Sequence, residues 1–229
     1  MLTYQDLLND IEKSKNEKLA EFSKPILNTN IAIKGIYSKD IKELIKKYKD
    51  IDINDFDLDV YYELNFLYIA IGLKQKKTLK EQIDFVFENS KHIVSWGITD
   101  STFRYFKLKD FEEALPVIQK FINTNDEFLI RYGYLFLFNF VKDKDNLERI
   151  FSLFRNSSYF YVKMVEGWVL SSLYIYSNEE TYNYLLNSSL DYEIKNIAIR
   201  KICDSYRVNK DEKDKLKLLR KRLKEKITN

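Results

Sequence analysis

The chain has 229 residues, of which 45% are apolar and 32% charged, and its formal net charge is +3. This composition excludes a disordered chain, and no uninterrupted apolar run is long enough to favour a membrane-spanning helix. The mixed charges of residues 1–15 do not fit a signal peptide, and the single cysteine, Cys203, suits a reducing compartment. We therefore expect a cytoplasmic protein.

Few residues interrupt helices in this sequence, which has only 5 Gly and 2 Pro. In chain order, we expect a helix over residues 2–13, a short helix over 16–22 stopped by Pro25, a connector over 28–37 that contains Gly35, a helix capped by Ser38, and an acidic loop over 50–57.

A repeat of roughly 33 residues follows. Aromatic and apolar stretches begin near Tyr61, Ile93, Asp126, Tyr159 and Glu193, and one-sided apolar segments lie between them. Thr78 and Asp126 are in position to cap helices. A period of this length is typical of stacked helix pairs, and no strand-like alternation persists. We predict one all-α domain over residues 1–229, a curved helical-repeat solenoid with a concave groove.

The end of the chain is basic. Lys and Arg occupy nine positions between Lys210 and Lys226. A basic helix suits the phosphate backbone of a nucleic acid, but a solvated terminal helix has the same composition. Both interpretations stay open at this point.

Several kinds of chemistry are excluded by the residue types. One His and one Cys cannot build a zinc or iron–sulfur site, and we expect His92 to cap a helix or lie at the surface. The sequence has no nucleophile elbow and no glycine-rich phosphate loop. An enzyme of this composition must use carboxylates, aromatic faces and Arg or Lys, and we expect no cofactor and no metal.

Three places on successive repeats stand out. Trp96 and Asp100 are four residues apart, so they share one face of a helix. Arg131 places a charge in an otherwise apolar helix, where it needs water or a partner. Trp168 follows an aromatic segment, residues 159–164. Each has a purely structural explanation, as core tryptophan, surface carboxylate or ion-pair partner, but neighbouring repeats place equivalent helices side by side.

At these residues the sequence resembles the bacterial DNA alkylation repair family, the AlkD-type alkylpurine DNA glycosylases built of HEAT-like repeats. Trp96 and Asp100 match its Trp-x-x-x-Asp motif, and residues 127–131 match its Glu-Phe-x-x-Arg. Further similar segments are residues 35–41, 159–168, 196–202 and 205–208. Pro and Arg of the family's first segment are missing, Gly97 stands where a larger residue is common, and Glu166 occupies a position that is usually small or apolar.

The resemblance implies a monomeric DNA glycosylase whose concave basic groove holds duplex DNA containing purines alkylated at N3 or N7. It implies a bacterial, cytoplasmic protein, associated with the nucleoid when bound to DNA. Asp100 would stabilise the positive sugar and position water, with Trp96 and Trp168 against the sugar-phosphate of the lesion. The DNA-binding residues would be Arg131, which holds a phosphate, and Phe160, Tyr161 and Lys163.

So sparse a site is chemically sufficient. An alkylated purine is cationic and leaves as a neutral base, so it needs no general acid, and one carboxylate can stabilise an oxocarbenium-like transition state. Aromatic faces can add cation–π stabilisation. Two alternatives remain open, a DNA-binding relative that has lost excision and a protein-binding helical repeat.

Overall fold

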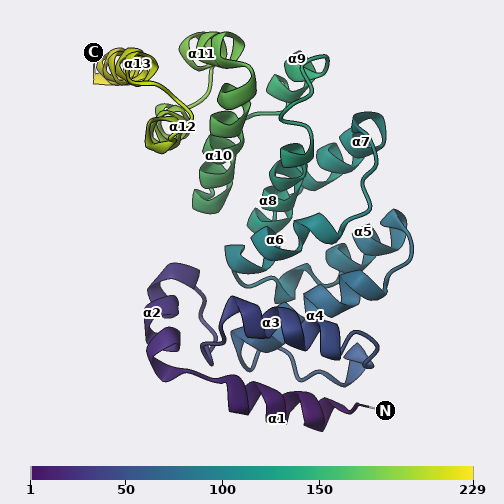
Figure 1. Ribbon diagram of the computed structural model, residues 1–229. Coiled ribbons are helices and arrows are strands. Elements are labelled where there is room, and N and C mark those ends of the chain that lie inside the picture. The colour runs from purple at the N-terminus through teal and green to yellow at the C-terminus, as the bar shows by residue number, and fades with distance from the viewer. Residues whose placement is uncertain (1, 229) are drawn as a thin grey trace. The chain divides into compact units, whose positions relative to one another are not determined.

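The computed structural model describes residues 2–228, and within them the chain is all α-helical (Figure 1). The described residues contain thirteen α-helices, four short 3-10 helices and no strand. The one β-type contact among them is an isolated bridge between Ala32 and Tyr61. The predicted all-α fold is therefore confirmed.

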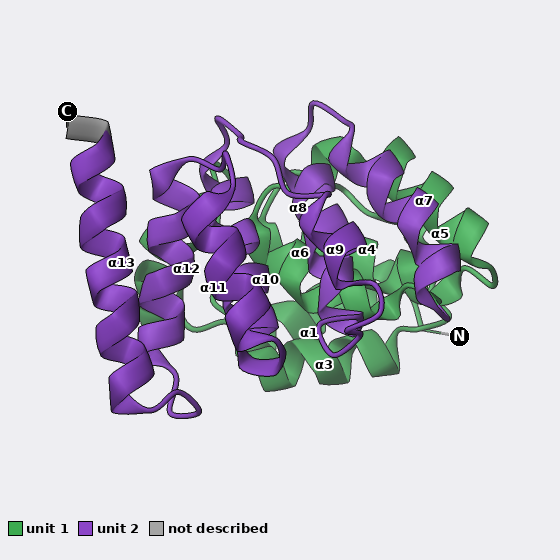
Figure 2. Cartoon of the chain, turned by 90° about the horizontal axis from the view of Figure 1, so that it is seen from above, with its two compact units in different colours: residues 1–108 green, residues 109–229 purple. Residues whose placement is uncertain are grey.

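The chain divides into two compact units, residues 1–108 and 109–229 (Figure 2). The first unit contains α1 (Tyr4–Ser14), α2 (Glu17–Leu27), α3 (Ser38–Lys47), η1 (Ile53–Asp55), α4 (Tyr62–Gln75), α5 (Leu79–Glu88), η2 (Ser90–His92), α6 (Trp96–Thr102) and η3 (Phe103–Tyr105). The second contains α7 (Phe111–Ile122), α8 (Glu127–Phe136), η4 (Leu137–Asn139), α9 (Leu147–Phe151), α10 (Phe160–Tyr176), α11 (Asn178–Asn187), α12 (Tyr192–Asp204) and α13 (Lys210–Thr228).

The predicted repeat is visible in the helix starts. The helices α4, α6, α8, α10 and α12 begin at residues 62, 96, 127, 160 and 192, each within three residues of the predicted start. In the second unit α10 packs against both α8 and α12, while α7 packs on α8, α11 on α10 and α13 on α12. In the first unit α4 contacts α3, α5 and α6. A single domain with one concave groove concerns the whole chain and stays a prediction.

The nearly all-apolar helices are those that lie inside the repeats. Most residues of α8 and α10 are buried, including Tyr132, Leu135, Val165 and Leu170. Side-chain caps start several helices where the sequence indicates them, since Thr78 forms a capping box with Glu81 and Asp126 accepts from two backbone amides. Helices that are apolar on most sides require neighbours on most sides, which the stacked repeats supply.

Three boundaries differ from the prediction. Pro25 does not stop α2, which continues to Leu27 and ends at Asn28 in the left-handed conformation, with φ 47°. Pro25 removes one hydrogen bond in the last turn, and the carbonyl of the exposed Glu21 that loses it can face water. Ser38 is the first residue of α3 and not its cap, and the helix expected over residues 93–106 is only Trp96–Thr102 followed by η3.

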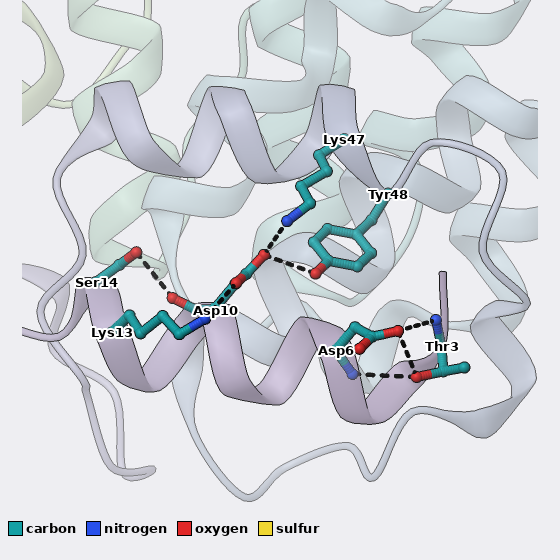
Figure 3. A network of polar contacts seen from close by, with 7 residues as sticks. All are labelled: Thr3, Asp6, Asp10, Lys13, Ser14, Lys47 and Tyr48. Carbon is teal, nitrogen blue, oxygen red and sulfur yellow. Dashed lines mark hydrogen bonds and ion pairs between the residues drawn. The ribbon is translucent and has the colours of Figure 1, made fainter. Parts of the chain in front are cut away.

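A polar network joins the first and third helices (Figure 3). Asp10 of α1 accepts hydrogen bonds from Tyr48 Oη at 2.7 Å and from Lys47 Nζ of α3. The Lys47 and Tyr48 hydrogen bonds lower the pKa of Asp10 to about 2, while burial chiefly raises that of Tyr48 to about 12. Thr3 and Asp6 form the capping box of α1 in the same view. The network anchors the N-terminal helix to the repeat that follows.

Candidate functional site

The first part of the candidate site is the short helix α6. Ser95 precedes the helix and its Oγ accepts from the Gly97 amide at 3.4 Å, which begins the helix at Trp96. Trp96 and Asp100 are one turn apart on α6, and both side chains are partly exposed. The predicted sharing of one helix face by these two residues is therefore present.

The indole of Trp96 is held by the end of α2. Its Nε1 donates a hydrogen bond to the Ile26 carbonyl at 2.8 Å, and Ser95 Oγ donates to the Leu27 carbonyl at 2.7 Å. The last carbonyls of a helix have no partner within it, so these two bonds satisfy groups that α2 cannot satisfy itself. The start of α6 and the end of α2 thus fix each other, and the aromatic face next to Asp100 has a defined position.

A threonine hydroxyl lies between the two predicted catalytic residues. Thr99 Oγ1 is 2.8 Å from the Trp96 carbonyl and 3.2 Å from Asp100 Oδ1. Because a hydroxyl has one proton, it donates to one acceptor at a time, and the shorter distance favours the Trp96 carbonyl. Thr99 is itself buried.

Tyr62 explains the glycine after Trp96. A Cβ atom at Gly97 would lie 2.5 Å from the Tyr62 hydroxyl and 2.9 Å from Leu27 Cδ2, so the close approach of these groups requires glycine. The Tyr62 ring stacks on Phe66 with centroids 6.1 Å apart. Burial, and to a smaller degree the charges of Glu63 and Asp100, raise the pKa of Tyr62 above its usual range, so its hydroxyl stays neutral.

The connector before α3 is also fixed from α4. Gly35 has φ +74°, and a Cβ there would lie 2.3 Å from the Asn16 carbonyl oxygen. The buried carboxylate of Glu63 accepts from the backbone amides of Lys34 and Gly35 at 3.0 and 2.8 Å. A glycine and a buried carboxylate thus determine the path of the chain between α2 and α3.

In the second unit Arg131 holds the start of α10. Arg131 is only 4% exposed, and its Nη1 donates to the Tyr161 carbonyl at 2.6 Å. Glu127 Oε1 accepts from the Tyr161 amide at 2.7 Å, and the Phe128 ring stacks on Tyr161. The Glu-Phe-x-x-Arg segment of α8 therefore binds the backbone and the ring of one residue. That Arg131 also contacts a phosphate stays a prediction.

Trp168 presents part of its ring to solvent. It is 37% exposed, its ring lies 4.7 Å from that of Phe138, and Lys201 Nζ of α12 lies 5.5 Å from its centroid. Of the residues predicted to bind DNA, Phe160 is 57% exposed, while Lys163 is largely covered and pairs with Glu193. The candidate residues fall into two sets, with Trp96 and Asp100 in the first unit and the others in the second, so their convergence stays a prediction.

A comparison with family models now places the chain. The model described as DNA alkylation repair enzyme matches residues 6–201. The chain belongs to the DNA alkylation repair enzyme family. A comparison with curated proteins finds no match. The matched residues run from α1 to the last turn of α12, so they include every candidate site residue, and they end before α13.

Family membership supports a role in the repair of alkylated DNA, with DNA as the substrate. Within residues 2–228, no group of three or more His, Cys, Asp or Glu side chains is arranged to hold a metal ion. Among these same residues, no helix has the length and apolarity needed to cross a membrane.

Some contacts of this repair protein were not apparent from its sequence. His92 is buried, with Nδ1 about 3.0 Å from Asp59, so neither a capping nor a surface position describes it. Ser95, Tyr62 and Lys201 position or cover the candidate residues. Ser95 directly precedes Trp96 and is a typical capping residue, which was a usable signal. Tyr62 and Lys201 are distant in sequence from their partners, so no local pattern indicates them.

Proposed function

We propose that this protein is a DNA glycosylase that hydrolyses the N-glycosidic bond of purines alkylated at N3 or N7 in duplex DNA. Membership of the DNA alkylation repair enzyme family gives the coarser role. The reaction, the lesion and the duplex substrate are the parts that the proposal adds.

One observation supports the proposal most. Trp96 is fixed by the Ile26 carbonyl, and the Asp100 carboxylate lies one turn further along the same helix. A partly exposed carboxylate beside a positioned aromatic face suits a sugar that becomes positive during reaction. Neither residue needs a metal or a cofactor for this role.

The reaction follows from the charge of the substrate. The bond between C1′ of the sugar and N9 of the purine breaks, and its electron pair neutralises the cationic base. The sugar becomes oxocarbenium-like, and the Asp100 carboxylate stabilises that charge and orients water. Water adds to C1′ and releases a proton. Because the base leaves neutral, no side chain has to protonate it.

The second unit would hold the DNA and add a second aromatic face. Trp168 and Phe160 have exposed ring surface for contact with the sugar-phosphate. Lys163 would exchange part of its contact with Glu193 for a phosphate. Arg131 and Tyr161 are bound to each other, so in this proposal Arg131 acts on DNA together with the start of α10.

The test is the release of free base. The full chain is incubated with methylated duplex DNA, and small molecules are separated and identified by chromatography, with unmethylated duplex as control. We expect 3-methyladenine and 7-methylguanine from the methylated duplex only. Binding of the methylated duplex without release of purine supports an inactive DNA-binding relative. Absence of both binding and release supports a protein-binding repeat.

A further inference from the structure

The last helix, α13, carries charge that the proposed site does not use. It spans Lys210–Thr228 and lies beyond the residues matched by the family model. Leu216, Leu219 and Leu223 are buried, and α13 packs on α12 (Figure 2). These leucines recur at a spacing of three and four, so one face of the helix is apolar and the rest faces solvent.

The solvent-facing part of α13 is strongly basic. Residues 217–226 contain six Lys or Arg and one carboxylate, a formal charge of +5 in a chain whose net charge is +3. Lys217, Lys221 and Lys224 are exposed and recur at a spacing of four and three, which places them in one stripe. The stripe is about 10 Å long from the helix rise, so its charges act together over a Debye length.

Ordinary helix stabilisation does not account for this charge. Lys217 pairs with Asp214 at 2.9 Å and Lys221 with Glu225 at 4.0 Å, but a single carboxylate lies within residues 217–226. Interaction of cations with the helix dipole is confined to the last turn. The excess of positive charge extends over more than two turns, which is a feature of surfaces that bind polyanions.

Contacts within the second unit place the basic half of α13. Near one end, Cys203 Sγ of α12 lies 3.8 Å from the Lys213 carbonyl, and near the other, the charge of Lys226 adds to burial in lowering the pKa of Lys195. The two helices are therefore antiparallel. The Lys163–Glu193 ion pair joins the starts of α10 and α12. The basic half of α13 thus lies at the end of the unit where α10 begins, with the exposed ring of Phe160.

We propose that the stripe Lys217, Lys221 and Lys224 is a further contact for the phosphate backbone of duplex DNA, outside the part of the chain that the family shares. The choice of DNA as the polyanion rests on the proposed function. The stripe supplies affinity without sequence information, because phosphates are the same at every base pair. It extends the contact area away from the reacting nucleotide.

The experiment compares two triple variants of the full chain. One carries Lys217→Gln, Lys221→Gln and Lys224→Gln. The matched control carries Lys109→Gln, Lys120→Gln and Lys144→Gln, three exposed lysines of the same unit. Affinity for a short unmodified duplex is measured over a series of salt concentrations. We expect the first variant to bind about tenfold more weakly at low salt and to lose about two to three units of the log–log salt slope, and the control to lose much less.

Further arms decide between explanations. Replacing the same three lysines with arginine keeps the charge and should keep the affinity. Equal duplex affinity of the two glutamine variants would overturn the proposal. Loss of binding only to vesicles of phosphatidylcholine and phosphatidylserine would overturn it in favour of a membrane contact. Because the duplex is unmodified, binding and base release are separate readouts, so failure of excision in the wild type leaves this test valid.

Discussion

At the residue scale, Glu166 is the clearest departure from an ordinary helix interior. It is fully buried in α10, Oε1 accepts from the Arg155 amide at 3.2 Å, and Oε2 has no hydrogen-bond partner among the described residues. Burial raises the pKa of Glu166 to about 7, against the lowering effects of the Tyr134 hydroxyl and the Arg155 amide. The resemblance identified this position as unusual, but only the structure shows that the carboxyl is enclosed.

The Glu166 pKa predicts a pH-dependent stability. Because the pKa is raised on folding, the folded state binds more protons than the unfolded state between pH 4.5 and about 7, and stability falls as the pH rises through this range. Glu166→Gln removes the buried charge, so relative to wild type it should gain on the order of 3 kcal/mol between about pH 4.5 and pH 8. Urea unfolding at both pH values measures this. Glu179→Gln, at an exposed carboxylate of α11, is the control. A difference between Glu166→Gln and wild type that does not change with pH would contradict the assignment.

Gly97 provides a second test at the residue scale. Alanine has the better helix propensity by about 1 kcal/mol, but its Cβ would overlap the Tyr62 hydroxyl. Tyr62 is stacked on Phe66 and cannot move freely, so overpacking should win and Gly97→Ala should destabilise by about 1–2 kcal/mol. Adding Tyr62→Phe removes the hydroxyl and should restore part of the loss in a double-mutant cycle of denaturant unfolding. Strictly additive effects would show that the hydroxyl is not the obstacle.

At the element scale, the sequence predicted helices better than it predicted their ends and contacts. Apolar periodicity and caps such as Thr78 and Asp126 are local signals, and both caps are present. Pro25 misled because a proline near an exposed helix end costs one hydrogen bond and not the helix. The bonds of Trp96 to Ile26 and of Arg131 to Tyr161 join residues 70 and 30 positions apart, which no local pattern specifies.

The contact between α8 and α10 predicts the consequence of losing Arg131. Arg131→Ala removes the donor to the Tyr161 carbonyl from a buried position, so the free energy of unfolding should fall by about 2 kcal/mol or more. Arg149→Ala is the matched control, because Arg149 forms an exposed ion pair with Glu112 whose loss should change stability little. Denaturant unfolding compares the two. Equal stability of both variants would show that the buried hydrogen bond contributes little and would leave DNA contact as the main role of Arg131.

At the scale of the whole molecule, the family assignment and the local geometry support one account. The match over residues 6–201 gives a role in DNA alkylation repair, and the Trp96–Asp100 face gives that role a reacting group. The sequence could predict an all-α repeat because each helix pair is encoded locally. It could not establish convergence of Trp96 with Trp168, because small rotations between successive repeats accumulate along the chain.

The most direct measurement is base release by Asp100→Asn. This change keeps the size of the side chain and removes the charge that would stabilise the sugar. With methylated duplex and enzyme in excess, we expect wild type to release 3-methyladenine and 7-methylguanine, and Asp100→Asn to do so about tenfold to thousandfold more slowly at nearly unchanged DNA affinity. Asp145→Asn makes the same charge change at an exposed loop position and should match wild type. Excision by Asp100→Asn at the wild-type rate would contradict the role of this carboxylate, and no release of purine by wild type would contradict glycosylase activity itself.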